Sequence, residues 1–308
     1  MPAPTYLRVV VTTRCPLACS YCHMEGDPAL PGQEGGLSTE DWCSLLHAAL
    51  DNGIRKLKFL GGEPLLRRDL PDIIRSLRAR DGEADLSLIT SGAAPRKMID
   101  DCFAAGLTRA NLSIHGWGPA AFARRGGRAR MFEHRGEVLA ALLEHGRFIK
   151  LNYVYSTAED VEDLAALLAW AAGQRLVVNV LDDLSRVDLS HHSVIDVVTG
   201  LRGQPAHTRV EPDPDSLPTL RLRWFDGLEV EVKDQHLGAL APWRACATCP
   251  VRARCREGIH ALRLGHTGRL RPCMDRQELG VGLLPALRRG GRGAVAEVWR
   301  GYVGRAAA

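Results

Sequence analysis

The chain of 308 residues is longer than one ordinary hydrophobic core requires, which predicts one large domain with a smaller appendage. Hydrophobic residues make up 45% of it and charged residues 25%, a composition that excludes wholesale disorder. The net charge of +4 is small, and no basic stretch with interleaved aromatic residues indicates a nucleic-acid groove. No apolar run is long enough for a membrane span and no signal peptide is evident, so we expect a cytoplasmic protein.

The first 185 residues alternate strand-like and helix-like segments at the spacing of β–α units. A β-branched run at 7–12 predicts the first strand, and Ser38 with Asp41 predicts a capping box before a helix that extends to Asn52. Further strands are expected at 57–60, 86–90, 109–114, 148–155 and 176–181, and further helices at 69–80, 96–105, 132–145 and 161–172. The pattern predicts an α/β fold, a partial (β/α)6 TIM-like barrel with its chemistry at the carboxyl ends of the strands.

The rest of the chain is expected to divide into two parts. Residues 186–216 are polar and rich in proline, and we interpret them as an irregular connection after a barrel domain of residues 1–185. Residues 217–308 are predicted to form a small α+β domain, because Asp226-Gly227 and Thr267-Gly268 are typical hairpin turns. A helix at 294–302 closes the chain.

Three cysteines, Cys15, Cys19 and Cys22, follow the first strand with the spacing C-x3-C-x2-C. In a reducing compartment, clustered cysteines indicate metal ligation rather than disulfides. Three thiolates can bind three irons of a [4Fe–4S] cluster and leave the fourth iron open for another ligand. The alternative is a zinc site with His23 as the fourth ligand.

The sequences LRVVVTTRCPLACSYCHMEG and KLKFLGGEPLLRRDLPDII resemble the GTP 3′,8-cyclase family of molybdenum-cofactor biosynthesis, within the radical S-adenosylmethionine (radical SAM) superfamily. The resemblance covers residues 6–182 well and the C-terminal part loosely. It implies that the open iron binds S-adenosyl-L-methionine, whose reductive cleavage yields methionine and a 5′-deoxyadenosyl radical. A reductant protein such as a flavodoxin or ferredoxin would supply the electron.

The same resemblance implies a set of cofactor-binding residues. Tyr21 would lie by the adenine, and the motif Gly61-Gly62-Glu63 would receive the methionine amino group. Polar residues that end later strands would approach the ribose and the carboxylate: Thr90, Ser91, Ser113 and Asn152. Each of these four residues has a structural alternative, in which it only turns the chain or caps a strand.

A second group of cysteines, Cys246, Cys249, Cys255 and Cys273, surrounds the second predicted hairpin. Four cysteines in this span can hold a second, auxiliary [4Fe–4S] cluster or a structural zinc. Their spacing resembles the twitch and SPASM extensions of the superfamily, which favours the auxiliary cluster.

The match to the GTP cyclases fails where a nucleotide triphosphate would bind. Two arginines of that family fall here on Ala261 and Arg263, so only one is retained, and a basic residue near the end of the sixth strand is replaced by Asp182-Asp183. A triphosphate needs a nearly complete set of cationic partners. The two aspartates favour a substrate with ammonium groups, and His115 and Trp117, after the fourth strand, are further candidate substrate residues.

Among relatives with a short auxiliary-cluster domain, the chain resembles radical SAM epimerases that act on aminoglycoside sugars. Epimerisation needs a hydrogen donor across the substrate from the radical, and Cys249 is the predicted donor, with Cys246, Cys255 and Cys273 as cluster ligands. The alternative makes all four cysteines ligands. Cys43 and Cys102 fall in predicted helices, where small buried cysteines are expected.

Three other functions remain open from the sequence. One is a radical cyclase or dehydrogenase that acts on a nucleotide. Another is a peptide-modifying enzyme of the twitch or SPASM type, for which a recognition segment before the first strand is expected, whereas five residues precede Tyr6. The last is a non-enzymatic iron–sulfur or zinc protein that senses redox state.

Overall fold

The computed structural model describes residues 4–27, 36–146, 149–174, 176–183, 194–212, 218–233, 243–252, 255 and 260–307. Six parallel strands form its centre: β1 (Tyr6–Thr12), β2 (Lys56–Gly61), β3 (Asp85–Thr90), β4 (Arg109–Ser113), β5 (Ile149–Tyr155) and β6 (Val177–Asp182). The helices between them are α1 (Thr39–Asp51), α2 (Leu70–Arg80), α3 (Arg96–Ala104), α4 (Pro119–Arg124), α5 (Ala129–His145) and α6 (Val161–Gln174). The predicted alternation of strands and helices is confirmed.

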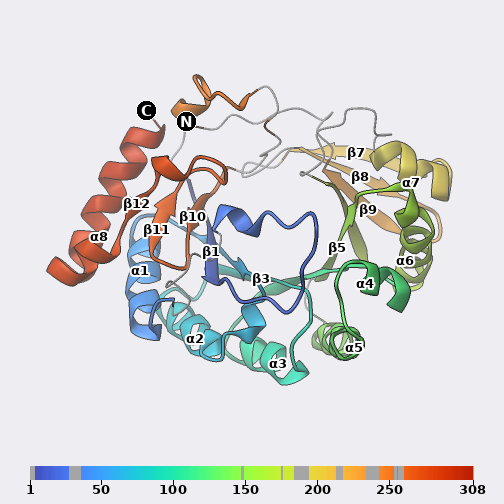
Figure 1. Ribbon diagram of the computed structural model, residues 1–308, viewed down its shortest axis with the longest axis horizontal. Helices are drawn as coiled ribbons and strands as arrows, with labels where there is room; N and C mark the ends of the chain where they lie inside the picture. The colour runs from blue at the N-terminus through green and yellow to red at the C-terminus, as the bar shows by residue number, and fades with distance from the viewer. Residues whose placement is uncertain are drawn as a thin grey trace.

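The C-terminal part adds α7 (Val194–Arg202), β7 (His207–Glu211), β8 (Thr219–Arg223), β9 (Glu229–Lys233), β10 (Leu262–Leu264), β11 (Arg269–Arg271), β12 (Val281–Gly282) and α8 (Leu284–Ala307). Short 3-10 turns are η1 (Met24–Gly26), η2 (Pro64–Leu66), η3 (Ala158–Asp160), η5 (Arg244–Cys246) and η7 (Gln277–Leu279). In the described residues all strands join one sheet in the order β12-β11-β10-β1-β2-β3-β4-β5-β6-β9-β8-β7. Helices α1, α2, α3, α5 and α6 form an arc around its outer side (Figure 1).

The C-terminal strands extend both edges of the predicted barrel. Strand β10 pairs parallel to β1, and β9 pairs parallel to β6, so the run of adjacent parallel strands is longer than the six that the sequence predicts. The expectation that residues 186–216 are irregular is wrong where α7 and β7 form. The prolines of this segment predict an irregular connection. However, β7, from His207 to Glu211, ends just before Pro212 and pairs with β8 along its whole length. The predicted domain boundaries at residues 185 and 217 therefore remain a prediction, and both predicted domains contribute strands to one sheet.

The two faces of the sheet have different chemistry because successive side chains of a strand point to opposite sides. On β1, Leu7 and Val9 are fully buried and belong to the apolar core that the outer helices share. Arg8 lies between them in sequence, and its register partners are Lys58 on β2 and Arg263 on β10. The inner face is therefore polar and charged, and it is the face available to a substrate.

Two local predictions are confirmed and one is extended. Ser38 is the N-cap of α1 and its side chain accepts a hydrogen bond from the Asp41 N–H at 3.1 Å. Gly227 and Gly268 have φ values of +90° and +77°, as hairpin turns of their type require. The final helix starts ten residues earlier than predicted, with a kink at Gly290 and Gly291. No helix in the described part of the chain is both long and apolar enough to span a bilayer.

Candidate functional site

Cys15, Cys19 and Cys22 lie on the loop between β1 and η1, which we call the cysteine loop. Cys15 and Cys22 are exposed and Cys19 is half-buried, and the Cys22 N–H closes a turn on the Cys19 carbonyl at 3.1 Å. Burial, with the neighbouring Cys22 and Cys15 thiols, raises the pKa of Cys19 to about 11. A metal that bound to these thiols would therefore displace their protons.

The motif Gly61-Gly62-Glu63 lies directly against the residues that lead into the cysteine loop. The Gly62 N–H donates to the Thr12 carbonyl and the Glu63 N–H to the Arg14 carbonyl, both at 2.8 Å. Gly61 has a φ of +142°, and a Cβ atom there would lie 2.1 Å from the Thr12 carbonyl oxygen. Only glycine allows this approach. The motif therefore fixes the backbone of the residues that immediately precede Cys15.

The side chain of Glu63 is fully buried and connects β2 to β3. It accepts hydrogen bonds from the Thr90 hydroxyl at 2.6 Å, from the Ser91 N–H at 2.8 Å and from the Leu65 N–H at 3.0 Å. Burial raises the pKa of Glu63, and these hydrogen bonds oppose that shift. The structure thus brings Glu63, Thr90 and Ser91 together, and their contact with S-adenosylmethionine remains a prediction.

Ser113 and Asn152 are register partners on β4 and β5, at the next positions along the same end of the sheet. Asn152 is buried, and its side-chain oxygen accepts a hydrogen bond from Asn179 on β6 at 3.0 Å. Thr90 is the register partner of Leu112, so Ser113 and Asn152 lie one residue further along the strands than Thr90. Their predicted role toward the ribose and carboxylate is not tested by any contact.

His115 contacts the cysteine loop. Its Nδ1 atom lies 2.6 Å from the Tyr21 hydroxyl and 3.4 Å from the Cys19 sulfur. Arg125 lies 5.3 Å over the Tyr21 ring and forms an ion pair with Asp160 at 2.7 Å. Burial, followed by the charges of Arg125 and Arg135, lowers the pKa of His115 to about 4, so its imidazole is neutral at pH 7. The sequence suggested His115 only as a substrate residue and gave no signal for Arg125.

Trp117 is held in place by its neighbours. Asp163 accepts hydrogen bonds from the N–H groups of Trp117 at 2.6 Å and Gly118 at 2.9 Å, and Arg135 donates to the Trp117 carbonyl at 2.9 Å. The indole ring packs on Trp170 of α6 with the ring centroids 4.6 Å apart. A substrate contact for Trp117 stays a prediction, beside this packing role.

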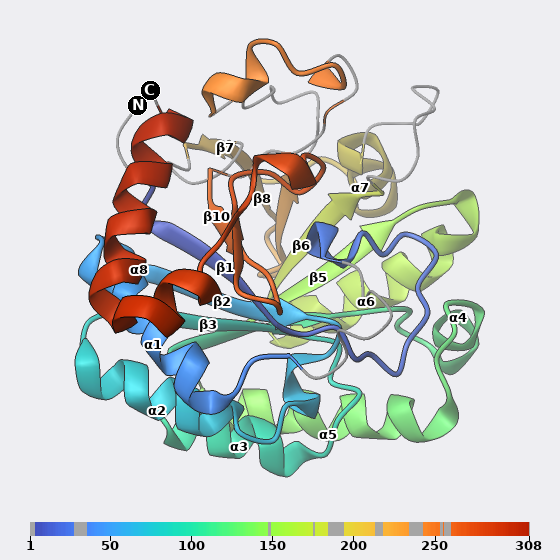
Figure 2. The same cartoon turned by 60° about the vertical axis from the view of Figure 1, so that its left-hand side comes forward.

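Asp182 is the last residue of β6, and Asp183 follows it. Asp182 is half-buried and Asp183 is buried. Because the carboxyl ends of parallel strands meet at one edge of a sheet, both lie at the same end as the cysteine loop. Figure 2 shows this loop, in dark blue, between the hairpin of β10 and β11 and helix α4.

The four C-terminal cysteines are half-buried: Cys246 in η5, Cys249 and Cys255 in the turns after it, and Cys273 just beyond β11. The N–H of Val251, and then the side chain of Arg276, lower the pKa of Cys249. Within the described residues no three His, Cys, Asp or Glu side chains are placed to hold one metal ion. A [4Fe–4S] cluster does not require its ligands to meet at one metal ion, because each thiolate binds a different iron atom.

Buried ion pairs connect η1 and Asp27, just after the cysteine loop, to the hairpin of β10 and β11, and no local sequence pattern indicates them. Arg8 Nε donates to Glu25 Oε2 at 2.9 Å, and Arg263 Nε lies 3.4 Å from the same oxygen. Asp27 accepts from the His266 backbone N–H at 2.7 Å and lies 3.5 Å from Arg271. Burial alone would raise the pKa of Glu25, but the Arg8 guanidinium outweighs it and holds the pKa well below its usual range.

Ion pairs also occur on the inner face near the other end of the strand order, at β5, β8 and β9. Glu231 of β9 forms ion pairs with Lys150 of β5 and with Arg221 of β8, the latter at 2.7 Å. Arg8, Arg263, Lys150 and Arg221 thus have carboxylate partners within the chain.

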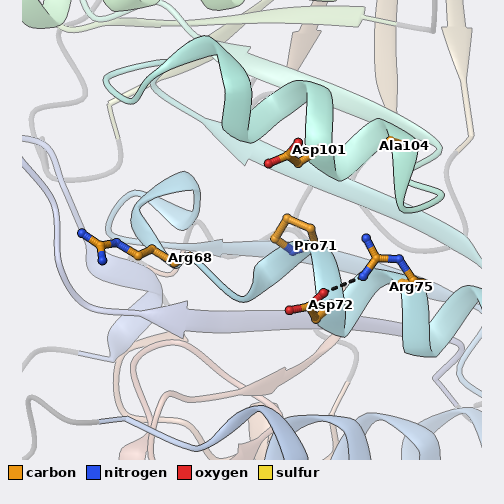
Figure 3. A pocket seen from close by; sticks show the side chains of 6 residues that line it. All are labelled: Arg68, Pro71, Asp72, Arg75, Asp101 and Ala104. Carbon is orange, nitrogen blue, oxygen red and sulfur yellow. Dashed lines mark hydrogen bonds and ion pairs between the residues drawn. The ribbon is translucent and has the colours of Figure 1, made fainter.

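A shallow groove on the outer surface is formed by α2 and α3 (Figure 3). Its lining residues are Arg68, Pro71, Asp72, Arg75, Asp101 and Ala104. None of the predicted site residues lines it, and it is made by the outer helices rather than by strand ends. We assign no function to this groove.

Comparison with known proteins adds the following. The sequence profile of the Radical SAM superfamily matches residues 9–171. The chain is 32% identical to the probable GTP 3′,8-cyclase of Methanopyrus kandleri over 87% of this chain and 80% of that protein. It is also 32% identical to the PqqA peptide cyclase of Xanthomonas axonopodis pv. citri over 75% of this chain and 59% of that one.

Among solved structures, Streptococcus suis SuiB bound to the precursor peptide SuiA superposes with a TM-score of 0.61. The sequence identity is 14%, and the match covers 89% of this chain and 60% of SuiB. At this identity the likeness concerns the fold alone. The predicted α/β barrel fold is confirmed.

Proposed function

The chain belongs to the radical SAM superfamily, and we propose that it uses this chemistry to invert one carbon of an aminoglycoside sugar of the neomycin type. As a member of that family it binds a [4Fe–4S] cluster and S-adenosyl-L-methionine. The residues fit this cofactor set: three cysteines lie on one loop, and the glycine motif is packed against the start of that loop. We propose that Cys15, Cys19 and Cys22 are the ligands.

When bound, the cluster and S-adenosylmethionine supply a 5′-deoxyadenosyl radical that removes a hydrogen atom from the substrate. The chain's own residues set the geometry around it. Gly61 and Gly62 fix the entry to the cysteine loop, and Glu63, after β2, fixes Thr90 and Ser91 at the end of the neighbouring strand β3. His115 and Arg125 hold Tyr21 against the loop.

The observation that carries the substrate proposal is the pairing of cations inside the sheet. Arg8 and Arg263 share Glu25, and Lys150 and Arg221 share Glu231. A polyphosphate would have to compete with these buried carboxylates for each cation, at the cost of leaving the carboxylates unpaired. The interior therefore suits a substrate of low negative charge better than a nucleoside triphosphate.

Asp182 and Asp183 add negative charge at the carboxyl end of β6, where parallel-sheet enzymes bind their substrates. A carboxylate here can form charge-assisted hydrogen bonds to ammonium groups, which fix orientation as well as adding attraction. This supports an amino sugar as the substrate.

We propose that Cys246, Cys255 and Cys273 hold an auxiliary [4Fe–4S] cluster and that Cys249 returns a hydrogen atom to the substrate radical from the opposite face. In that step the S–H bond of Cys249 breaks and a C–H bond forms with inverted configuration. The sulfur is left as a thiyl radical, which must be reduced by one electron and one proton before the next turnover. Cys249 is only half-buried, which supports access of a substrate to its thiol.

The names of the relatives favour a second candidate, a radical cyclase acting on a nucleotide or a peptide. The GTP 3′,8-cyclase match extends over most of both chains, and none of the relatives named above is an epimerase. In this candidate all four C-terminal cysteines are cluster ligands and no hydrogen atom is returned. A reducing compartment, the cytoplasm, suits either candidate, given nine cysteines in the chain.

Turnover in D2O separates the candidates. With dithionite, S-adenosylmethionine and neomycin C or a related aminoglycoside, the proposed epimerase should yield a product with one deuterium at one inverted carbon. Cys249→Ala should still form 5′-deoxyadenosine and keep the iron content of the wild type while losing the epimer. A loss of about one cluster of iron would instead make Cys249 a ligand. Consumption of GTP with no change in the aminoglycoside would establish the second candidate.

A further inference from the structure

An exposed basic surface lies beside the cysteine loop. The sequence from Ala123 to Arg130 reads ARRGGRAR, and three of its arginines, Arg124, Arg128 and Arg130, are exposed. Arg14, the residue before Cys15, is exposed as well. We call these four arginines the basic surface. It stands out because the chain as a whole carries a net charge of only +4.

The basic surface is fixed to the loop by close backbone packing. A Cβ atom on Gly126 would lie 3.4 Å from the Ala18 nitrogen and 3.5 Å from the Ala18 oxygen, so the two backbones run close together, with room for about one methyl group between them. Arg125, between the exposed arginines, forms an ion pair with Asp160 and lies over Tyr21. The end of α4 and the start of α5 therefore lie next to the cysteine loop.

The part of the loop next to this surface is open to solvent. Ala18 and Ser20, on either side of Cys19, are exposed. Figure 2 shows the loop extending to the right-hand side of the molecule, next to α4. A protein seated on the arginines would therefore contact the loop itself.

We propose that the basic surface docks an acidic one-electron carrier protein of the flavodoxin or ferredoxin type. The inference rests on the cluster that the cysteine loop holds and is independent of the epimerase reaction. Each reductive cleavage of S-adenosylmethionine needs one electron, so the carrier is oxidised by one electron and the cluster is reduced from its 2+ to its 1+ state. No covalent bond forms between the two proteins.

Charge complementarity is what selects this partner. Clustered charges of one sign raise the rate of encounter with an oppositely charged protein by about 10- to 1,000-fold at low ionic strength. The effect falls as salt increases, because the Debye length is about 8 Å at physiological ionic strength. Docking through arginines next to the loop also holds the carrier where its electron has the shortest path.

The test measures the rate at which a photoreduced bacterial flavodoxin reduces the cluster of the reconstituted enzyme, followed by stopped-flow absorbance at low salt. The variant carries Arg124→Glu, Arg128→Glu and Arg130→Glu, and Arg14 is left intact because it precedes a ligand. Glutamates at the start of α5 are compatible with the helix dipole. The second-order rate should fall by about tenfold or more, and its dependence on salt should weaken.

Two controls keep the result specific. The triple variant Arg289→Glu, Arg300→Glu, Arg305→Glu makes the same change in net charge on α8, on the opposite side of the molecule in Figure 1. It should reduce the rate much less. Dithionite, a small reductant, should support the same amount of 5′-deoxyadenosine in all three proteins. The proposal is wrong if the first variant is reduced by flavodoxin at the wild-type rate, or if both variants lose the same factor.

Discussion

Glu25→Gln should destabilise the protein strongly, because Glu25 is the shared partner of two buried arginines. Arg8 and Glu25 are 7% exposed each, and Arg263 is 1% exposed. Removing one partner of a buried ion pair typically costs about 3–5 kcal/mol, since the other charge stays buried without compensation. For a chain of this size, roughly 2 °C of unfolding temperature corresponds to 1 kcal/mol. We therefore expect a decrease of roughly 6–10 °C.

Anaerobic thermal unfolding of the reconstituted enzyme, followed by circular dichroism, measures this effect. Asp72→Asn is the matched control: it breaks the Asp72–Arg75 pair shown in Figure 3, in which both side chains are more than 60% exposed. Such a surface pair contributes about 0–1 kcal/mol. The double variant Arg8→Gln/Glu25→Gln removes one charge of each sign and should recover part of the loss. An unfolding temperature for Glu25→Gln within about 2 °C of the wild type would refute the reasoning.

Three further predictions concern Gly61, Asp163 and the acid stability of the protein. Gly61→Ala places a Cβ atom 2.1 Å from the Thr12 carbonyl and should lower the iron content per chain, whereas Gly82→Ala, with no neighbour within 4 Å, should leave it unchanged. Asp163→Asn weakens the hydrogen bonds from Trp117 and Gly118 and should cost about 1–3 kcal/mol, visible in tryptophan fluorescence during urea unfolding. The pKa values of Glu25 and Asp27 are held below their usual range, against the effect of burial, by Arg8 and by His266 respectively. Their contribution is complete above an unfolded pKa of about 4 and is lost as the pH falls below it. The unfolding temperature should therefore drop in acid, and the drop should be smaller in Glu25→Gln; equal drops would contradict this assignment.

The barrel could be predicted from the sequence because its signals are local. Apolar periodicity, the Ser38 cap and the two Gly turns each depend on a few neighbouring residues, and each is confirmed. The joining of the C-terminal strands to both edges of the sheet could not be predicted in this way. It depends on pairing between β1 and β10, which are separated by most of the chain.

In the candidate site too, features with local sequence signals could be predicted and features that depend on long-range contacts could not. The cysteine spacing and the glycine motif are short patterns with fixed chemistry, and the structure brings them together. The partners of Arg8 and Lys150 are Glu25 and Glu231, and nothing in the local sequence indicates that these carboxylates neutralise the interior cations. The position of His115 after β4 makes it a candidate substrate residue, whereas its contact with Tyr21 and Cys19 depends on the folded structure.

The most direct measurement is the formation of 5′-deoxyadenosine by the anaerobically reconstituted protein with dithionite and S-adenosyl-L-methionine. The wild-type protein should form it, and Cys19→Ala should form none while the unchanged cysteines at 246–273 keep their iron. A wild-type protein that carries iron and sulfide at the cysteine loop but releases no 5′-deoxyadenosine would contradict the assignment of this loop as the radical-generating site.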